Sequence, residues 1–289
     1  MAALLVIAAP PQLEGSIAQR LDPIWSHFPK LSWIQFKLAG PRCPTTGPAG
    51  TFLVRFREAH GSMYGSADPG EHLTFAVHEQ LRVSARLALP AGARACYVLA
   101  HGAGAGMMQP FLSACAAGLA ALGVATLRFQ FPYMERHARR PDPPALCHAT
   151  VRAAVAEAAR RTALPLFGGG RSFGGRMTSQ AQALEPLPGI RGLAFLGFPL
   201  HPAARPGDAR AQHLSDVRIP LLFIQGTQDA LAERARMETL VARLGPRAQL
   251  SWVEGADHSF HVPARSGRTD AQARSALLQA LRTWMDALL

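Results

Sequence analysis

From about residue 72 onward, short apolar runs alternate with longer segments in which apolar residues recur at helical spacing. The short runs have the length of β-strands, and the longer segments have the period of amphipathic helices. Strands that alternate with helices pair mostly in parallel, and the helices cover both faces of the sheet. The pattern therefore predicts an α/β domain over residues 71–289, built on a mostly parallel central sheet.

The predicted domain opens with a β-hairpin formed by LTFAV and LRVSARLAL. Further strands are predicted at CYVLAHG (96–102), VATLRFQF, LPLFG (164–168), RGLAFLGFPL, PLLFIQG (220–226) and QLSWVEG (249–255). Helices are predicted at PFLSACAAGLAALG, ALCHATVRAAVAEAARR, the segment after residue 172, LAERARMETLVARLG and from about Asp270 to Leu288. Sheets of this kind bind ligands beyond the carboxyl ends of their strands, so the site is expected at that edge.

Residues 1–70 do not join this alternation. They hold both lysines, two of the four tryptophans and the segment GPRCPTTGPAG (40–50), whose composition is typical of a break or linker. We interpret them as an N-terminal extension that is loosely structured, or as the result of a mis-called start upstream of a true first residue at Met63. The apolar first residues have no Lys or Arg ahead of them, which argues against a signal peptide.

The net charge of +11 raises nucleic acid or an anionic membrane as a partner. However, 28 of the 30 basic residues are arginines scattered along the chain, and no aromatic residues interleave with them as a stacking surface requires. No apolar run has the length of a membrane span. We therefore expect a solvated basic surface and a small-molecule substrate, with no nucleic-acid or membrane partner; the oligomeric state is left open.

The cysteines are widely spaced and include no C-x-x-C pair. This spacing predicts neither a zinc site nor a disulfide framework. Two of them lie in apolar runs, where buried thiols favour a reducing, cytoplasmic location. The four are Cys43, Cys96, Cys115 and Cys147.

The stretch FGGGRSFGGR (167–176) packs five glycines around one serine, between a predicted strand and a predicted helix. Gly170, Ser172 and Gly174 form G-x-S-x-G, the nucleophile elbow, in which a strained turn holds the serine and its neighbours must be small. As a bare pattern this is a weak signal in a glycine-rich chain. The prediction therefore depends on the rest of the site.

A serine hydroxyl needs a base and an orienting acid to act as a nucleophile at neutral pH. Asp229 comes just after the strand PLLFIQG, and His258 comes just after QLSWVEG. The order Ser172, Asp229, His258 is the order of an α/β-hydrolase triad. Asp257 adjoins His258 in sequence and is badly placed to bond its ring, so Asp229 is preferred as the acid.

The loop HGAGAGM (101–107) follows the strand CYVLAHG, and its small residues let backbone N–H groups approach a ligand. We expect an oxyanion hole formed by the N–H groups of Ala103 and Phe173, with Gly102 or Gly104 as alternatives within the loop. His201 follows GFPL at a strand end and is the histidine favoured to face the site, whereas His101 and His261 are left as pocket or structural residues. The predicted pocket residues are His101, Gly102, Met107 and His201.

Each feature also has a simpler interpretation. A histidine after a strand is often a polar surface residue, Asp229 can cap a helix that starts at Leu231, and HGAGAGM can be a plain turn. Their occurrence together, in the correct order and each at a strand end, favours the catalytic interpretation.

The chain resembles the predicted α/β-hydrolases related to dienelactone hydrolase in five segments: HGAGAGM, GRSFGGRM, GFPLHP, LLFIQGTQD and GADHSF. The resemblance is to the branch that includes the testis-expressed and non-specific-lethal-complex-subunit proteins, and it covers roughly residues 72–289. It implies the α/β-hydrolase fold, a triad of Ser172, Asp229 and His258, and no cofactor or metal. Dienelactone hydrolases proper use a cysteine nucleophile where this chain has Ser172, so their substrate is not carried over.

These features predict a serine hydrolase that cleaves a small ester, thioester or lactone through an acyl-enzyme. The alternative is a non-catalytic scaffold or partner-binding subunit with the same fold, because some members of the resembling family serve as assembly subunits and fold alone does not decide function.

Only about 20 residues, HPAARPGDARAQHLSDVRIP, separate GFPL from PLLFIQG, too few for a multi-helix cap domain. We therefore expect no large cap and an open site that favours short acyl groups. The loop FPYMERHARRPDPP follows a strand at the same edge and is expected to bring positive charge to the entrance, favouring anionic substrates, unless its basic residues are merely solvated. These residues are Arg136, His137, Arg139 and Arg140.

Overall fold

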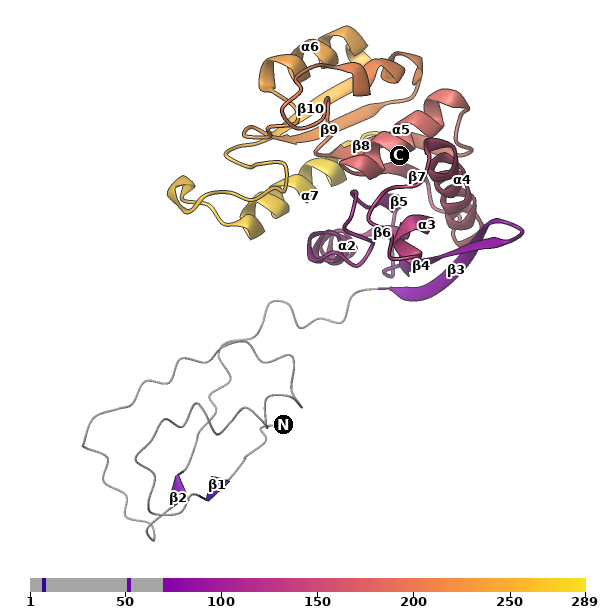
Figure 1. Ribbon diagram of the computed structural model, residues 1–289, viewed down its shortest axis with the longest axis vertical. Helices are drawn as coiled ribbons and strands as arrows, with labels where there is room; N and C mark the ends of the chain where they lie inside the picture. Colours follow the sequence, from indigo (N-terminus) through magenta and orange to yellow (C-terminus); the bar gives the residue numbers. More distant parts are fainter. Residues whose placement is uncertain (1–6, 9–50, 53–69) are drawn as a thin grey trace, which may run out of the picture. The chain divides into compact units, whose positions relative to one another are not determined.

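The structure, a computed structural model, describes residues 7–8, 51–52 and 70–289 (Figure 1). The chain divides into two compact units, Met1–Gly65 and Ser66–Leu289. In the first, strands β1 (Ile7–Ala8) and β2 (Thr51–Phe52) pair antiparallel. The predicted extension over residues 1–70, with the alternative start at Met63, lies almost entirely outside the described residues and stays a prediction. Cys43 also lies outside them.

The second unit is built on an eight-stranded sheet with the strand order β10-β9-β8-β7-β5-β6-β4-β3. The pairings from β6 through β5, β7, β8 and β9 to β10 are parallel, and only β3 and β4 add antiparallel pairs at one edge. The mostly parallel sheet predicted from the sequence is confirmed. The strands are β3 (Glu71–His78), β4 (Leu81–Ala88), β5 (Ala95–Ala100), β6 (Val124–Phe129), β7 (Leu166–Arg171), β8 (Ile190–Leu196), β9 (Leu221–Gly226) and β10 (Ala248–Val253).

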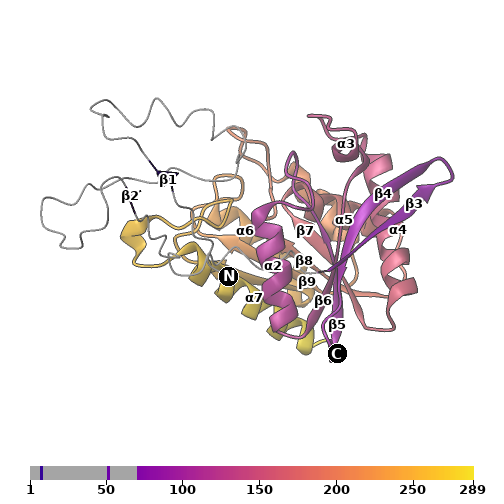
Figure 2. The same cartoon turned by 90° about the horizontal axis from the view of Figure 1, so that it is seen from below.

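Helices cover both faces of this sheet, as Figures 1 and 2 show. Two hydrophobic cores lie on either side: one includes side chains of α2 and α7, and the other includes side chains of α4, α5 and α6. The helices are α2 (Pro110–Ala121), α3 (Pro132–Glu135), α4 (Pro144–Arg161), α5 (Phe173–Leu184), α6 (Arg234–Leu244) and α7 (Asp270–Asp286), with short 3₁₀ helices η2 (Ala209–Asp216), η3 (Gly245–Arg247) and η4 (Ala264–Ser266).

The burial of each strand explains its sequence pattern. Every residue of β5, β6, β7 and β9 is buried, as expected for mostly apolar strands covered on both faces. β3 instead alternates between exposed and buried positions near its centre, as an edge strand with one solvated face does. Cys96 and Cys115 are buried as predicted, and burial raises the pKa of each thiol to about 12.

Three local differences from the sequence prediction concern the site. β7 continues past the predicted end at Gly168 to Arg171, because its glycines pack closely on neighbouring strands. α6 begins at Arg234 rather than Leu231. The segment predicted as a loop after β6 contains the short helix α3.

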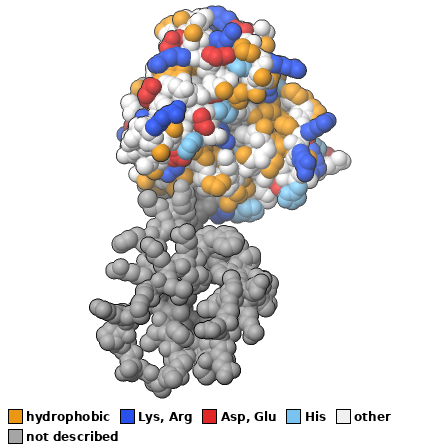
Figure 3. Space-filling model, turned by 60° about the vertical axis from the view of Figure 1, so that its left-hand side comes forward, with side chains coloured by type: hydrophobic (Ala, Val, Ile, Leu, Met, Phe, Trp, Pro, Cys, Tyr) orange, Lys and Arg blue, Asp and Glu red, His pale blue; other side chains and the backbone are white. Residues whose placement is uncertain are grey.

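The charged surface of this unit has no continuous basic strip on the face in Figure 3, where arginines lie apart among acidic and apolar side chains. Among the described helices, none is long and apolar enough to span a bilayer.

Candidate active site

Ser172 lies in the turn between β7 and α5, with φ 49° and ψ −113°. This positive φ is strained for any residue with a Cβ. The turn is fixed by close packing: a Cβ on Gly174 would lie 2.5 Å from the carbonyl oxygen of His101, and one on Gly170 would lie 2.4 Å from that of Ala100. Both outer positions of G-x-S-x-G therefore require glycine, as the nucleophile-elbow geometry predicts.

We expect Ser172→Gly to be more stable than Ser172→Ala. Alanine keeps the Cβ and the strain, which costs about 1–3 kcal/mol at such a position. Glycine removes that strain at an entropic cost of roughly 0.5–1 kcal/mol, so its melting temperature should be higher by about 2–4 °C per kcal/mol gained. Calorimetric melting of the two variants checks this; an equal or lower midpoint for Ser172→Gly would show that the turn stores no strain.

The structure brings Ser172, His258 and Asp229 into one chain of hydrogen bonds. Ser172 Oγ lies 2.9 Å from His258 Nε2, and His258 Nδ1 lies 2.7 Å from Asp229 Oδ2. Asp229 follows β9 and its side chain is fully buried, whereas the His258 side chain, in the turn after β10, is 23% exposed. With Nδ1–H donated to the carboxylate, Nε2 is left to accept the serine proton.

Asp229 is held by two further donors. The side-chain amide of Gln225 donates to Oδ2, and the backbone N–H of Leu231 donates to Oδ1 at 2.8 Å. Gln225 is fully buried in β9, and its Oε1 also accepts the N–H of Phe198 at 2.9 Å. Sequence reasoning missed Gln225, although a glutamine inside an apolar strand run was a usable signal.

Ala103 and Phe173, the predicted oxyanion donors, both line the hollow that contains Ser172. Phe173 is the first residue of α5, so its N–H has no acceptor within the helix. A Cβ built on Gly102 would lie 4.0 Å from Ser172 Cβ, which places the loop after β5 beside the nucleophile. The N–H of Gly104 already donates to Tyr133 Oη at 3.3 Å, so Ala103 and Gly102 are the better candidates in this loop.

His101 lies behind this loop and is fully buried. Its Nε2 accepts the N–H of Phe131 at 3.0 Å, so the proton is on Nδ1, which donates to the carbonyl of Gly102 at 2.8 Å. Burial lowers the pKa of His101 to about 4. The neutral ring thus holds the backbone of the loop after β5 and does not line the hollow that contains Ser172.

Met107 and His201 are both buried, and neither lines the Ser172 hollow. Met107 is buried, and its N–H donates to the side chain of Gln130 at 2.8 Å. The His201 ring, 3% exposed, contacts the Glu233 carboxylate at 2.8 Å through Nε2. His261 pairs with Asp270 at the surface. None of the four predicted pocket residues is in the lining of the Ser172 hollow, although Gly102 lies in the loop beside the nucleophile.

His101 and the half-buried His213 are expected to make stability depend on pH. His213 Nε2 lies 2.8 Å from Ser179 Oγ, and burial, with the nearby charges of Arg176 and His148, lowers the pKa of His213 to about 4. His101 has a similarly low pKa. The unfolded chain binds these protons near pH 6.5 and the folded chain only near pH 4, so stability present above pH 6.5 is lost as pH falls towards 4.

We therefore expect the free energy of unfolding to drop between pH 7 and pH 4.5, with His101 alone contributing on the order of 3 kcal/mol. His213→Gln should make the drop smaller. Urea unfolding of wild type and His213→Gln at several pH values measures this fall in the free energy of unfolding. The same dependence of the free energy on pH in both proteins would rule out a contribution from His213.

The Ser172 hollow has a volume of about 360 Å³. Its lining is largely apolar, with two arginines and one carboxylate. The lining residues are Ala103, Pro141, Asp142, Pro144, Ser172, Phe173, Arg176, Met177, Pro199 and Arg210.

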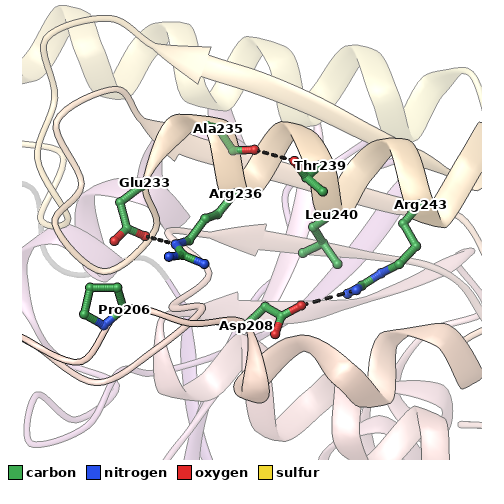
Figure 4. A pocket seen from close by; sticks show the side chains of 8 residues that line it. All are labelled: Pro206, Asp208, Glu233, Ala235, Arg236, Thr239, Leu240 and Arg243. Atoms are coloured by element: carbon green, nitrogen blue, oxygen red, sulfur yellow. Dashed lines mark hydrogen bonds and ion pairs between the residues drawn. The ribbon is translucent and has the colours of Figure 1, made fainter.

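A larger hollow, of about 530 Å³, lies over α6 and contains none of the predicted site residues (Figure 4). Its charged side chains are paired within it: Glu233 with Arg236 at 3.5 Å, and Asp208 with Arg243 at 3.2 Å. These charges satisfy one another, so the Ser172 hollow is the better candidate site.

The loop between β6 and α4 does not supply the arginines of the Ser172 hollow. Arg136 pairs with the lining carboxylate of Asp142, and Arg139 and Arg140 are exposed outside the lining. The arginines in the lining are instead Arg176 and Arg210, which sequence reasoning did not single out. Within the described part of the chain, no three His, Cys, Asp or Glu side chains cluster to hold a metal ion.

Comparisons with a family model and with solved structures agree on the same fold, that of an alpha/beta hydrolase. A family model described as an alpha/beta hydrolase domain matches residues 93–286. The structure of dienelactone hydrolase from Anabaena variabilis is 22% identical and covers 77% of this chain and 100% of its own, with a TM-score of 0.61. A serine hydrolase without a lid from Xanthomonas campestris is 22% identical over 76% of this chain and 96% of its own (TM-score 0.59).

An alpha-beta serine hydrolase homologue from Coxiella burnetii is 18% identical over 75% of this chain and 100% of its own (TM-score 0.58). At these identities the likeness establishes the fold alone. The predicted α/β-hydrolase fold without a large cap domain is confirmed: residues 197–220, between β8 and β9, hold only the short helix η2.

Proposed function

Because the chain belongs to the alpha/beta hydrolase domain family, we propose that it is a serine hydrolase that cleaves a small ester, thioester or lactone. The observation that carries the proposal is the chain of hydrogen bonds from Ser172 through His258 to the buried Asp229, at 2.9 and 2.7 Å. It starts at a serine on a strained turn, an arrangement that aligns a nucleophile with its base.

In the proposed reaction, Ser172 Oγ attacks the substrate carbonyl while His258 Nε2 takes its proton. Asp229 stabilises the imidazolium, and the N–H groups of Phe173 and of Ala103 or Gly102 bind the oxyanion. His258 then protonates the leaving group as the bond to the carbonyl carbon breaks, which gives the acyl-enzyme. A water molecule, deprotonated by the same histidine, releases the acid and restores Ser172.

A fluorophosphonate probe tests this proposal directly. Such a probe phosphonylates a serine only where a base activates it. Wild type should be labelled, Ser172→Ala should not, and Ser215→Ala, which changes an exposed serine on η2, should be labelled like wild type. Equal labelling of wild type and Ser172→Ala would refute the proposal.

The same labelling experiment distinguishes the proposed hydrolase from the alternative, a non-catalytic scaffold. We propose, from the five sequence segments, that the chain is related to the branch that includes the testis-expressed and non-specific-lethal-complex-subunit proteins. Some members of that branch serve as assembly subunits. Unlabelled Ser172 in a protein that co-purifies with a stoichiometric partner would favour the scaffold. A small-molecule substrate and a cytoplasmic location likewise stay predictions.

Short acyl chains should be preferred. A buried methylene contributes about 0.8 kcal/mol to binding, but the segment between β8 and β9 holds only η2 and forms no cap that would bury a long chain. We expect a higher kcat/KM for p-nitrophenyl acetate than for the decanoate, measured below the solubility limit of the latter. A clear preference for the decanoate would contradict the open site.

A further inference from the structure

Two guanidinium groups converge on the hollow that contains Ser172. Arg176 lies on α5 and lines the same hollow as Ser172, and its guanidinium stacks over the Phe173 ring at 5.6 Å. Arg210 reaches the hollow from η2, where its Nη1 donates to the carbonyl of His201 at 3.0 Å. Elements from two parts of the fold thus aim positive charge at one place.

Neither arginine is paired with an acid within the described residues. The Nε of Arg176 is buried and has no hydrogen-bond partner, and Arg210 bonds only a backbone carbonyl. Several other arginines are paired with acids, such as Arg160 with Glu157 at 2.7 Å and Arg282 with Asp286 at 2.7 Å.

The carboxylate in the lining, Asp142, is already neutralised. It accepts the backbone N–H of Tyr133 at 2.7 Å and pairs with Arg136, and only 6% of its side chain is exposed. His148 and His213 lie close enough to Arg176 for its charge to lower their pKa, in addition to burial, and a histidine side chain supplies no negative charge to offset Arg176. The hollow is therefore left with a net positive charge.

Burial lowers the pKa of Arg176, and the nearby Arg210 lowers it further. Two partly buried like charges are unfavourable unless an anion accompanies them, and the planar guanidinium is suited to bidentate bonds with a carboxylate.

We propose that Arg176 and Arg210 bind a carboxylate of the substrate, so that the hydrolysed ester or thioester is a monoester of a dicarboxylic acid. The inference rests on the proposed function for the role of Ser172 and adds the substrate class. It assigns the selectivity for anions to these two residues, in place of the loop arginines expected from the sequence.

The test compares mono-4-nitrophenyl adipate with its methyl ester, a neutral substrate of nearly the same size. The measured quantity is the ratio of kcat/KM for the acid to that for the methyl ester, after subtraction of spontaneous hydrolysis. We expect wild type to favour the acid, and Arg176→Gln and Arg210→Gln each to lower the ratio by about 10-fold or more, as for loss of a charge-assisted hydrogen bond.

Arg139→Gln is the matched control, because it removes the same charge from an exposed position outside the lining. It should leave the ratio within about twofold of wild type, since an exposed charge is screened by salt. An equal fall in Arg139→Gln and the two lining variants would mean general electrostatic attraction and overturn the proposal, as would a wild-type preference for the methyl ester. Arg210→Gln keeps the test decisive if Arg176→Gln does not fold.

Calorimetric titration of adipate into Ser172→Ala separates this proposal from the proposed function. Binding that weakens about 10-fold or more when Arg176→Gln is added supports the subsite even if no ester is hydrolysed. Absence of adipate binding to Ser172→Ala, when the wild type hydrolyses p-nitrophenyl acetate, overturns the subsite alone.

Discussion

Ser172→Ala is expected to lower kcat for p-nitrophenyl acetate by about 10⁴-fold or more, and His258→Ala by a similar factor. The double variant should lose little more than either single variant, because the 2.9 Å contact between Ser172 Oγ and His258 Nε2 makes the two groups one functional unit. Steady-state kinetics with single-turnover controls measures the three values, and circular dichroism verifies that each variant is folded.

Multiplicative losses in the double variant would indicate that the two residues act independently. A small effect of Ser172→Ala would mean that the observed hydrolysis takes place elsewhere, and would remove the basis of the proposed mechanism.

Asp229→Asn is expected to lower kcat by about 10⁴-fold. The carboxylate accepts from three donors: His258 Nδ1 and the Gln225 amide at Oδ2, and the Leu231 N–H at Oδ1. An asparagine amide has one oxygen, so its NH₂ group must face a donor on one side. Either the His258 ring loses the acceptor that fixes its tautomer, or the backbone N–H of Leu231 loses its acceptor.

Asp257→Asn is the matched control for this variant. Asp257 adjoins His258 in sequence, but its Oδ1 accepts the backbone N–H groups of Ser259 and His261 at 2.7 and 3.0 Å. We expect kcat to fall by less than about tenfold, because this carboxylate shapes the turn and does not orient the base. A larger loss in Asp257→Asn than in Asp229→Asn would exchange the two assignments.

The sequence by itself was sufficient for the architecture and for the three residues at the centre of the site. Mostly apolar runs of strand length, separated by segments with helical periodicity, are compatible with few arrangements other than a parallel sheet with helices on both faces. In such a sheet the carboxyl ends of parallel strands meet at one edge, so polar residues that follow different strands approach one another. Ser172, Asp229 and His258 are brought within hydrogen-bond distance in this way.

The surroundings of those residues depended on the tertiary structure. Gln225 and His101 support the site through single hydrogen bonds that no periodicity encodes. His201 follows a strand end, as the sequence indicated, yet its ring turns to Glu233.

The arginines show the physical reason most plainly. In a chain with 28 arginines, nothing local distinguishes Arg210 from Arg139 and Arg140, and the segment GRSFGGRM does not by itself show where the Arg176 side chain points. Which guanidinium groups face Ser172 depends on the path of the non-periodic segments around η2 and α3, and on which carboxylates are already paired. Those properties arise only when distant parts of the chain pack together, so the sequence determined which three residues form the hydrogen-bond chain, and the tertiary structure decided which charged groups line the hollow around Ser172.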